Sequence, residues 1–180
     1  MTIAAEAQQL LQGAEMVFTE AQVSAAVDKM AHDVSAALSD ADPLVLSVMG
    51  GAVVFSGWLL PKLRFPLDFD YVQASRYRNQ IQGHDIHWRV APSDNVHGRT
   101  VLLLDDILDE GITLAAVRDK CMEAGAARVL IAVLTEKATG RPKPIQANFV
   151  GLVVPDRYVF GCGMDVHGRW RNLPAIYALK

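Results

Sequence analysis

Apolar positions recur along this chain with two spacings, which predict helices alternating with strands. Over residues 19–38 apolar side chains return every three or four positions, as on one face of a helix, and Thr19 is a candidate cap for its start. Similar patterns predict helices over 52–63 and 113–124, the second closed by Gly125. Short apolar or alternating runs predict strands over 43–48, 67–72, 86–90, 100–104 and 128–134.

This order of elements favours an α/β fold, a parallel twisted sheet with helices on both faces. Ligands bind beyond the carboxyl ends of the strands in such sheets. We therefore expect Gly50-Gly51, residues 105–113 and the residues after Leu134 to share one rim. The polar, glycine-containing stretch 75–85 is a candidate mobile loop.

Shorter strand-like runs at 149–154 and 157–160, with many prolines, predict a small C-terminal hood from about residue 141. The 180 residues fit a single domain, 1–180, with its core at about 19–140. The hood would be mainly 141–180, and the N-terminal segment is a candidate contributor. The first forty residues match no pattern with a known role.

Composition narrows the classes of protein and partner. A chain that is 51% hydrophobic and 21% charged is typical of a soluble globular protein. The sequence shows neither a leader-like start nor an apolar run long enough to cross a membrane. We therefore expect a cytoplasmic setting and no membrane partner. Cys121 and Cys162 have no disulfide or zinc spacing and are interpreted as plain thiols. The net charge of −3, without a dense Lys/Arg run, argues against nucleic-acid binding.

The stretch 101–114 carries the most specific chemistry. A fully apolar run ends in two carboxylates, Asp105 and Asp106, and a short turn containing Gly111 then opens a helix. Free N–H groups at a helix start, with the Thr113 hydroxyl, can cradle a phosphate. The two acids are better suited to hydroxyl groups or a metal-bound sugar, because they would repel the phosphate. The alternative is that these acids only cap the helix.

The pattern of two acids, two aliphatic residues, Asp, a variable residue, Gly, a variable residue and Thr resembles the signature of type I phosphoribosyltransferases. The resemblance implies that Asp105 and Asp106 hold the ribose hydroxyls and Mg²⁺. It also implies that the backbone of Asp109, Glu110, Gly111, Ile112 and Thr113 holds a 5′-phosphate, and that Asp109 acts catalytically at purine N7. Glu110 stands where the family usually has Thr.

The tail, residues 154–161, 163–165 and 171–174, is similar to the hood of hypoxanthine-guanine phosphoribosyltransferases. By that similarity Tyr158 stacks on the purine and the Val159 backbone meets the base edge. Asp165 reaches a second Mg²⁺, and Arg171 contacts pyrophosphate. The alternatives are that Tyr158 is a core residue, Arg171 a surface cation and Asp165 a turn residue.

Two further segments match the same family. Lys137 stands where the family has a lysine that donates to purine O6, although a lysine after a strand is ordinarily solvated. Met49, Gly50 and Gly51 resemble the pyrophosphate loop, with a cis peptide expected between Val48 and Met49. Many relatives have lysine in place of Met49.

Tyr77 resembles the catalytic tyrosine of the mobile loop in this family. Relatives usually have Ser before it, where this chain has Arg76. The charge of Arg76 could hold pyrophosphate or be solvated.

The resemblance implies a Mg²⁺-dependent hypoxanthine-guanine phosphoribosyltransferase of purine salvage. Its substrates would be 5-phosphoribosyl-1-pyrophosphate and a 6-oxopurine base, and it would assemble as a homodimer or homotetramer. A xanthine-preferring enzyme and a non-catalytic nucleotide-sensing regulator with the same fold are the alternatives.

Overall fold

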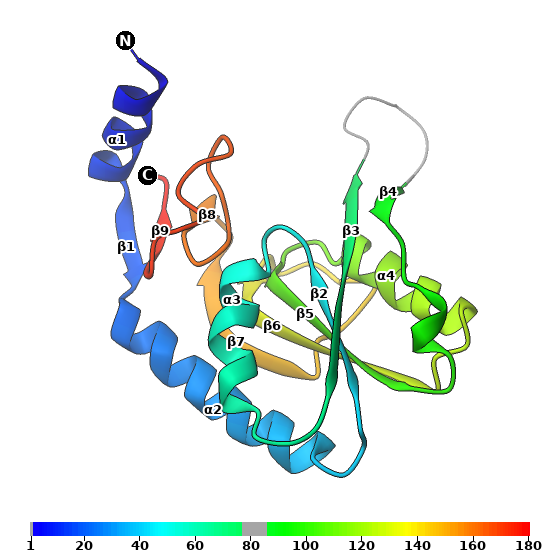
Figure 1. Cartoon of the computed structure of the whole chain (residues 1–180). Helices are drawn as coiled ribbons and strands as arrows, with labels where there is room; N and C mark the ends of the chain where they lie inside the picture. Colours follow the sequence, from blue (N-terminus) through cyan, green and yellow to red (C-terminus); the bar gives the residue numbers. More distant parts are fainter. Residues whose placement is uncertain (1, 77–85) are drawn as a thin grey trace.

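The computed structural model describes residues 2–76 and 86–180, which contain a large and a small sheet (Figure 1). The large sheet has the strand order β4-β3-β2-β5-β6-β7. Its strands are β2 (Leu44–Val48), β3 (Asp68–Arg76), β4 (Ile86–Val90), β5 (Thr100–Leu108), β6 (Arg128–Ala138) and β7 (Phe149–Pro155). Neighbouring strands are parallel except for β4, which pairs with β3 in the antiparallel sense.

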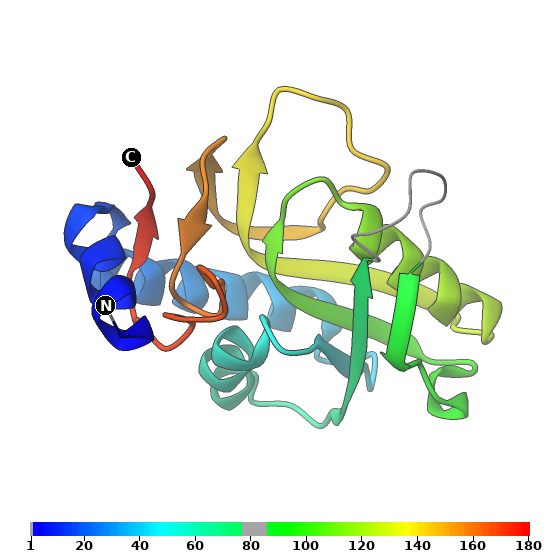
Figure 2. The same ribbon diagram turned by 90° about the horizontal axis from the view of Figure 1, so that it is seen from above.

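Helices cover both faces of this sheet, as Figure 2 shows. On one face α2 (Glu20–Leu38) and α3 (Val53–Leu59) pack against inward side chains that include Leu102 and Leu104. On the other face α4 (Ile112–Glu123) packs against side chains that include Val101 and Leu103. Both faces of β5 are therefore buried, which explains its unbroken apolar run. The predicted fold class is confirmed.

The small sheet joins the two ends of the chain. It contains β1 (Glu15–Phe18), β9 (Ile176–Ala178) and β8 (Val159–Phe160) in the order β1-β9-β8, with antiparallel pairs. The preceding helix α1 (Ile3–Gly13) contacts the C-terminal segment, where the Trp170 indole N–H donates to the Ala7 carbonyl oxygen at 2.8 Å. Neither α1 nor β1 was predicted from the sequence. For β1 the reason is that a four-residue strand depends on a partner far away in the chain.

Several predicted boundaries shift. Strand β5 continues to Leu108, four residues beyond the predicted end, because its parallel pairing with β6 extends to the Leu108 and Glu136 register. Asp105 and Asp106 thus lie within the strand. The helix predicted to reach residue 63 ends at Leu59 and continues as a 3-10 turn, Leu60–Lys62, that contains Pro61. A second 3-10 turn spans Asp94–Val96. Thr19 caps the start of α2, as predicted, through a capping box with Gln22.

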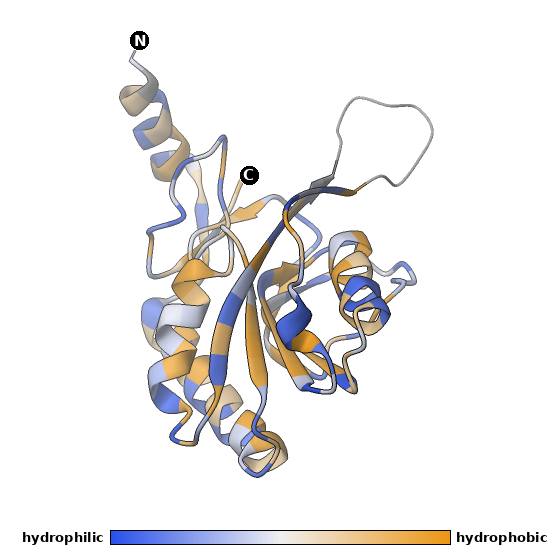
Figure 3. Ribbon diagram, turned by 45° about the vertical axis from the view of Figure 1, so that its right-hand side comes forward, coloured by the Kyte–Doolittle hydropathy of each residue, from blue (hydrophilic) through white to orange (hydrophobic). Residues whose placement is uncertain are grey.

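The hydropathy of the elements agrees with this arrangement. In Figure 3 the strands in the middle of the sheet are mainly hydrophobic, and hydrophilic positions lie on the helices, on the connecting segments and along the long strand in front. Cys121 and Cys162 are free thiols in the core, where burial raises their pKa values to about 11 and about 12. None of the helices within 2–76 and 86–180 has the length and apolar character needed to cross a membrane.

Candidate active site

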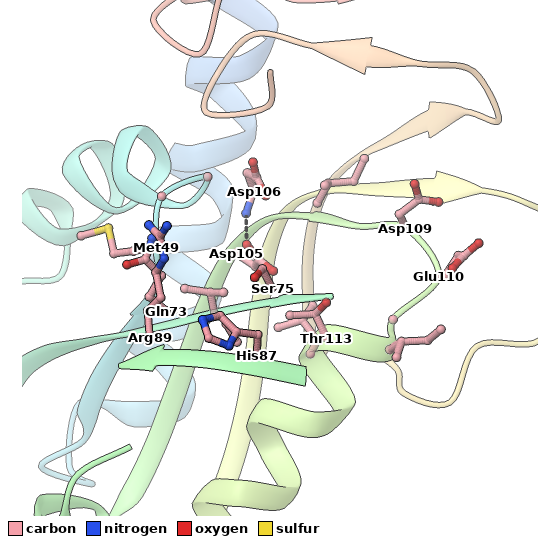
Figure 4. Close-up of a pocket in the computed structure, with 18 of the residues that line it drawn as sticks. Met49, Gln73, Ser75, His87, Arg89, Asp105, Asp106, Asp109, Glu110 and Thr113 are labelled. Carbon is pink, nitrogen blue, oxygen red and sulfur yellow. Dashed lines mark hydrogen bonds between the residues drawn. The ribbon is translucent and has the colours of Figure 1, made fainter. Parts of the chain in front are cut away.

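A cavity of about 560 Å³ opens at the carboxyl ends of the central strands (Figure 4). Its walls come from the loop after β2, the end of β3, the strand β4, the end of β5, the start of α4 and one C-terminal residue. The polar or glycine residues among them are Gly50, Gly51, Gln73, Ser75, His87, Arg89, Asp105, Asp106, Asp109, Glu110, Gly111, Thr113 and Arg171. Two of the three predicted parts of the rim, Gly50-Gly51 and residues 105–113, therefore line one cavity, whereas no residue directly after Leu134 does.

Two buried carboxylates form the centre of this cavity. Asp105 and Asp106 are only 9% and 8% exposed, and the Asp106 N–H donates to Asp105 Oδ1 at 3.0 Å. Burial, and then the charge of Asp106, raises the pKa of Asp105 well above its usual value. Burial also raises the pKa of Asp106, although its hydrogen bond with Asp105 and the charge of Arg171 oppose this. The pair suits a ligand that brings hydroxyl donors or a cation.

The loop after β2 brings its main chain against this acid pair. A Cβ atom on Gly51 would lie 2.1 Å from Asp106 Oδ2, so only glycine allows so close an approach. The predicted position of the cis peptide is wrong by one bond, because it lies between Met49 and Gly50. Val48 still pairs with Val72, and the Met49 N–H donates to the Val72 carbonyl oxygen at 2.8 Å, so the peptide before Met49 continues the strand.

The start of α4 forms the opposite end of the cavity. Gly111 precedes the helix with a φ of 80°, in the left-handed region that favours glycine. The first helical hydrogen bond runs from Ala115 N to Gly111 O, so the N–H groups of residues 112–114 have no partner within the helix. These N–H groups and the Thr113 hydroxyl make a site for an anion. Glu110, which is exposed, lies at the edge of this site.

A second cavity of about 250 Å³ adjoins the first and shares Asp106, Ile107 and Asp109 with it. Its other walls are Lys137, Tyr158, Val159, Met164 and Asp165. Tyr158 is 50% exposed, so it is not a core residue, whereas Val159 is buried and leaves its main chain for contact.

Lys137 lies inside β6 and not after a strand. Its ammonium group is 2.7 Å from Asp109 Oδ2, and the two side chains are 13% and 43% exposed. Lys137 is therefore not an ordinary solvated lysine. It connects the second cavity to Asp109 of the first.

The C-terminal segment links the two cavities through one ion pair. Arg171 Nη2 lies 2.6 Å from Asp165 Oδ1, and Arg171 Nη1 donates to the Gly163 carbonyl oxygen. The other oxygen of Asp165 accepts from the Gly168 N–H at 2.7 Å. Asp165 thus forms a turn and also faces the second cavity, while Arg171 reaches the first.

Comparison with known proteins agrees with this geometry. Residues 13–167 match the phosphoribosyl transferase domain family. The chain is 30% identical to the hypoxanthine-guanine phosphoribosyltransferase of Bacillus subtilis over 167 residues, 92% of this chain and 93% of the relative. This chain belongs to the phosphoribosyltransferase family.

Further relatives carry similar names. A hypoxanthine-guanine-xanthine phosphoribosyltransferase of Tritrichomonas foetus is 28% identical and is covered over 91% of its length by 92% of this chain. A solved hypoxanthine-guanine phosphoribosyltransferase of Bacillus anthracis is 25% identical, with a TM-score of 0.85 over 92% of this chain and 98% of that one.

The carboxylate oxygens of this site are donor atoms of the kind that Mg²⁺ binds. No cluster of three or more His, Cys, Asp or Glu suited to a metal occurs in the described part of the chain. Mg²⁺ typically binds through one or two carboxylates, several waters and substrate phosphates. The buried pair Asp105 and Asp106, and separately Asp165, offer carboxylates of this kind.

The wall contributed by β3 and β4 was not predicted from the sequence. Gln73, Ser75, His87 and Arg89 all line the first cavity. The alternation of polar His87 and Arg89 with apolar neighbours was the available signal, since it places both on one side of a strand. Tyr77 and most of the predicted mobile loop lie outside the described residues.

Proposed function

We propose that this chain transfers the 5-phosphoribosyl group of 5-phosphoribosyl-1-pyrophosphate to N9 of hypoxanthine or guanine. The products are IMP or GMP and pyrophosphate, as in purine salvage. One observation carries the proposal: a buried acid pair and an open helix N-terminus share one cavity, and Asp109 joins that cavity to the ion-paired Lys137 of an adjoining cavity. The names of the curated relatives support the same substrates.

The first cavity holds the ribosyl donor. The N–H groups at the start of α4 and the Thr113 hydroxyl bind its 5′-phosphate. Asp105 and Asp106 accept hydrogen bonds from the ribose hydroxyls, which compensates their burial. At the other end, the main chain of 49–51 and the Arg171 guanidinium bind the pyrophosphate group.

The second cavity holds the base. The Lys137 ammonium has three donors, so it can donate to purine O6 and keep its ion pair with Asp109. The half-exposed ring of Tyr158 stacks on the purine, and the main chain of Val159 contacts the base edge.

The reaction is a displacement at C1′ by purine N9. Asp109 lies beside Lys137, where it accepts the proton of N7 as N9 attacks. Catalysis rests on positioning and on stabilising positive charge at C1′, because the protein forms no covalent bond. The resemblance assigns Tyr77 to a loop that covers the reacting atoms and excludes water.

Asp105, Asp106 and Asp165 are the proposed protein contacts for Mg²⁺. The ion would neutralise charge on the departing pyrophosphate. Because Asp165 also holds Arg171, one carboxylate would connect the ion to the pyrophosphate-binding guanidinium.

Xanthine is the main alternative base, since one relative is named for it. A regulator with this fold, which would bind nucleotides without turnover, is the alternative from another class. Steady-state kinetics with the ribosyl donor, Mg²⁺ and a panel of hypoxanthine, guanine, xanthine and adenine distinguishes them. We expect the highest kcat/KM on hypoxanthine or guanine and almost none on adenine. A preference for xanthine, or turnover of no base, would refute the proposal.

We also propose a cytoplasmic enzyme that assembles as a homodimer or homotetramer. Val53, Phe69 and Tyr71 support assembly, because these large apolar side chains are 44% to 48% exposed. Light scattering coupled to gel filtration should give two or four chain masses. A monomer at micromolar concentration would contradict this.

A further inference from the structure

Among the described residues, the lining of the donor cavity has few positive charges for a ligand rich in phosphate. Four acids line it: Asp105, Asp106, Asp109 and Glu110. The basic side chains in the described lining are Arg89, Arg171 and His87, and no described lysine lines the cavity. Arg171 is already paired with Asp165, whereas no described acid is paired with Arg89, so Arg89 is a second arginine that can hold phosphate.

The sheet register places Arg89 beside the pyrophosphate loop. The Met49 N–H donates to the Val72 carbonyl oxygen, so this loop begins next to β3 at Val72. The following residue, Gln73, pairs with Val90 of β4, the neighbour of Arg89. In Figure 4 Met49, Gln73 and Arg89 lie together at one end of the cavity.

The opposite end belongs to the helix start. Asp109, Glu110 and Thr113 lie there, across the acid pair from Arg89 (Figure 4). An anion beside Arg89 would therefore be the pyrophosphate and not the 5′-phosphate.

The side chain of Arg89 is available for a ligand. It makes no hydrogen bond or ion pair with any residue of the described part of the chain, in contrast to Arg99, Arg118, Arg157 and Arg171. Its neighbour Trp88 packs against the core cluster beneath α4, which fixes the rotation of β4. Arg89 therefore projects from a held strand, and its planar guanidinium can donate two parallel hydrogen bonds to phosphate oxygens.

We propose that Arg89 binds the pyrophosphate group of the ribosyl donor and the pyrophosphate product. This inference deepens the proposed function and rests on it. Arg89 complements the main-chain donors of residues 49–51, where Met49 supplies no charge. Its positive charge also favours departure of the leaving group, since negative charge grows on the pyrophosphate as the bond to C1′ breaks.

Kinetics of Arg89→Gln and Arg89→Lys, with Arg118→Gln as a matched control, test this role. Arg118 lies on α4 outside both cavities and is paired with Asp119 at 2.6 Å. Each variant is assayed at saturating hypoxanthine with varied donor, and then the reverse. Titration calorimetry with inorganic pyrophosphate and Mg²⁺ measures product binding directly.

For Arg89→Gln we expect the donor KM and the pyrophosphate Kd to rise at least about tenfold, the usual loss for charged hydrogen bonds. The hypoxanthine KM should change less than about twofold, and the Lys variant should recover part of the loss. The Arg118→Gln control should match the wild type. If Arg89→Gln does not fold, the donor KM and the pyrophosphate Kd of Arg89→Lys test the assignment instead.

Donor KM and pyrophosphate Kd within twofold of wild type in the folded variant would overturn the assignment. An equal rise in the hypoxanthine KM would also overturn it, because it would indicate general damage. If the wild type turned over no base, the proposed function would fail, yet the pyrophosphate titration would still test Arg89 by itself.

Discussion

Replacing Lys137 separates base recognition from folding. Lys137 is 13% exposed and pairs with Asp109 at 2.7 Å, but Asp109 is 43% exposed, so water can replace the lost partner. A pair of this kind contributes at most about 1 kcal/mol to the free energy of unfolding. The proposed bond to purine O6 is a charged hydrogen bond in the second cavity and contributes about 1.5–3 kcal/mol.

Lys137→Gln should therefore lower kcat/KM for hypoxanthine and guanine by about 10-fold to 150-fold, the equivalent of that free energy. The donor KM should stay within about twofold, because the anion site at α4 is separate. The thermal midpoint should fall by less than about 4 °C for a chain of this size. The assay is steady-state kinetics on both bases and on adenine, with circular dichroism melting as the control for folding.

Adenine gives the second half of this test. Its 6-amino group presents donors to a lysine that can only donate, so the wild type should reject adenine by a factor of roughly 10⁴. The reasoning is refuted if adenine is a good substrate of the wild type, or if Lys137→Gln keeps full activity on either oxopurine.

Three further changes test other parts of the site. Burial raises the pKa of Asp105, so the ionised carboxylate lowers the stability of the folded protein at neutral pH. Asp105→Asn should therefore raise the melting midpoint at pH 7 by about 2–4 °C, while kcat/KM collapses. This gain in the midpoint should vanish below about pH 4, where the carboxyl group is protonated in the folded and the unfolded state. An unchanged or lower midpoint at pH 7 would contradict this. Trp170→Phe removes the hydrogen bond from the indole of Trp170, the residue before Arg171, to the Ala7 carbonyl oxygen. The donor KM should therefore rise a few-fold, with a loss of about 0.5–1.5 kcal/mol in the free energy of unfolding in urea melts. A change in the base KM alone would contradict this. Tyr158→Ala should raise the base KM about tenfold. The free energy of unfolding should stay within about 0.5 kcal/mol of the wild-type value, since the ring is half exposed. A large loss of stability would instead indicate that Tyr158 packs against the protein.

The sequence was sufficient for the core of the fold because its pattern is local. The apolar run of β5, the helical spacing in α2 and the glycine before α4 each constrain nearby residues only. The acids, the glycine and Thr113 share one short segment, so their meeting in one cavity followed from the strand-turn-helix order.

The rest depends on contacts between distant segments. β1 becomes a strand only by pairing with β9, about 160 residues later, and nothing in its four residues indicates that partner. Arg89 enters the cavity because β4 adds to the sheet edge in the antiparallel sense, which alternation alone does not reveal. The ion pair of Lys137 with Asp109 likewise depends on the register of β6 against β5.

The most direct test of the account is the product formed by wild-type protein and by the double variant Asp105→Asn/Asp106→Asn. Each is incubated with hypoxanthine, 5-phosphoribosyl-1-pyrophosphate and Mg²⁺, and IMP and pyrophosphate are quantified by mass spectrometry and an enzyme-coupled assay. We predict equimolar IMP and pyrophosphate from the wild type and at least about 100-fold slower formation by the folded variant, since both donor contacts are lost. No IMP from the wild type, or equal rates from the two proteins, would contradict the central claim that the buried acid pair holds the donor for phosphoribosyl transfer.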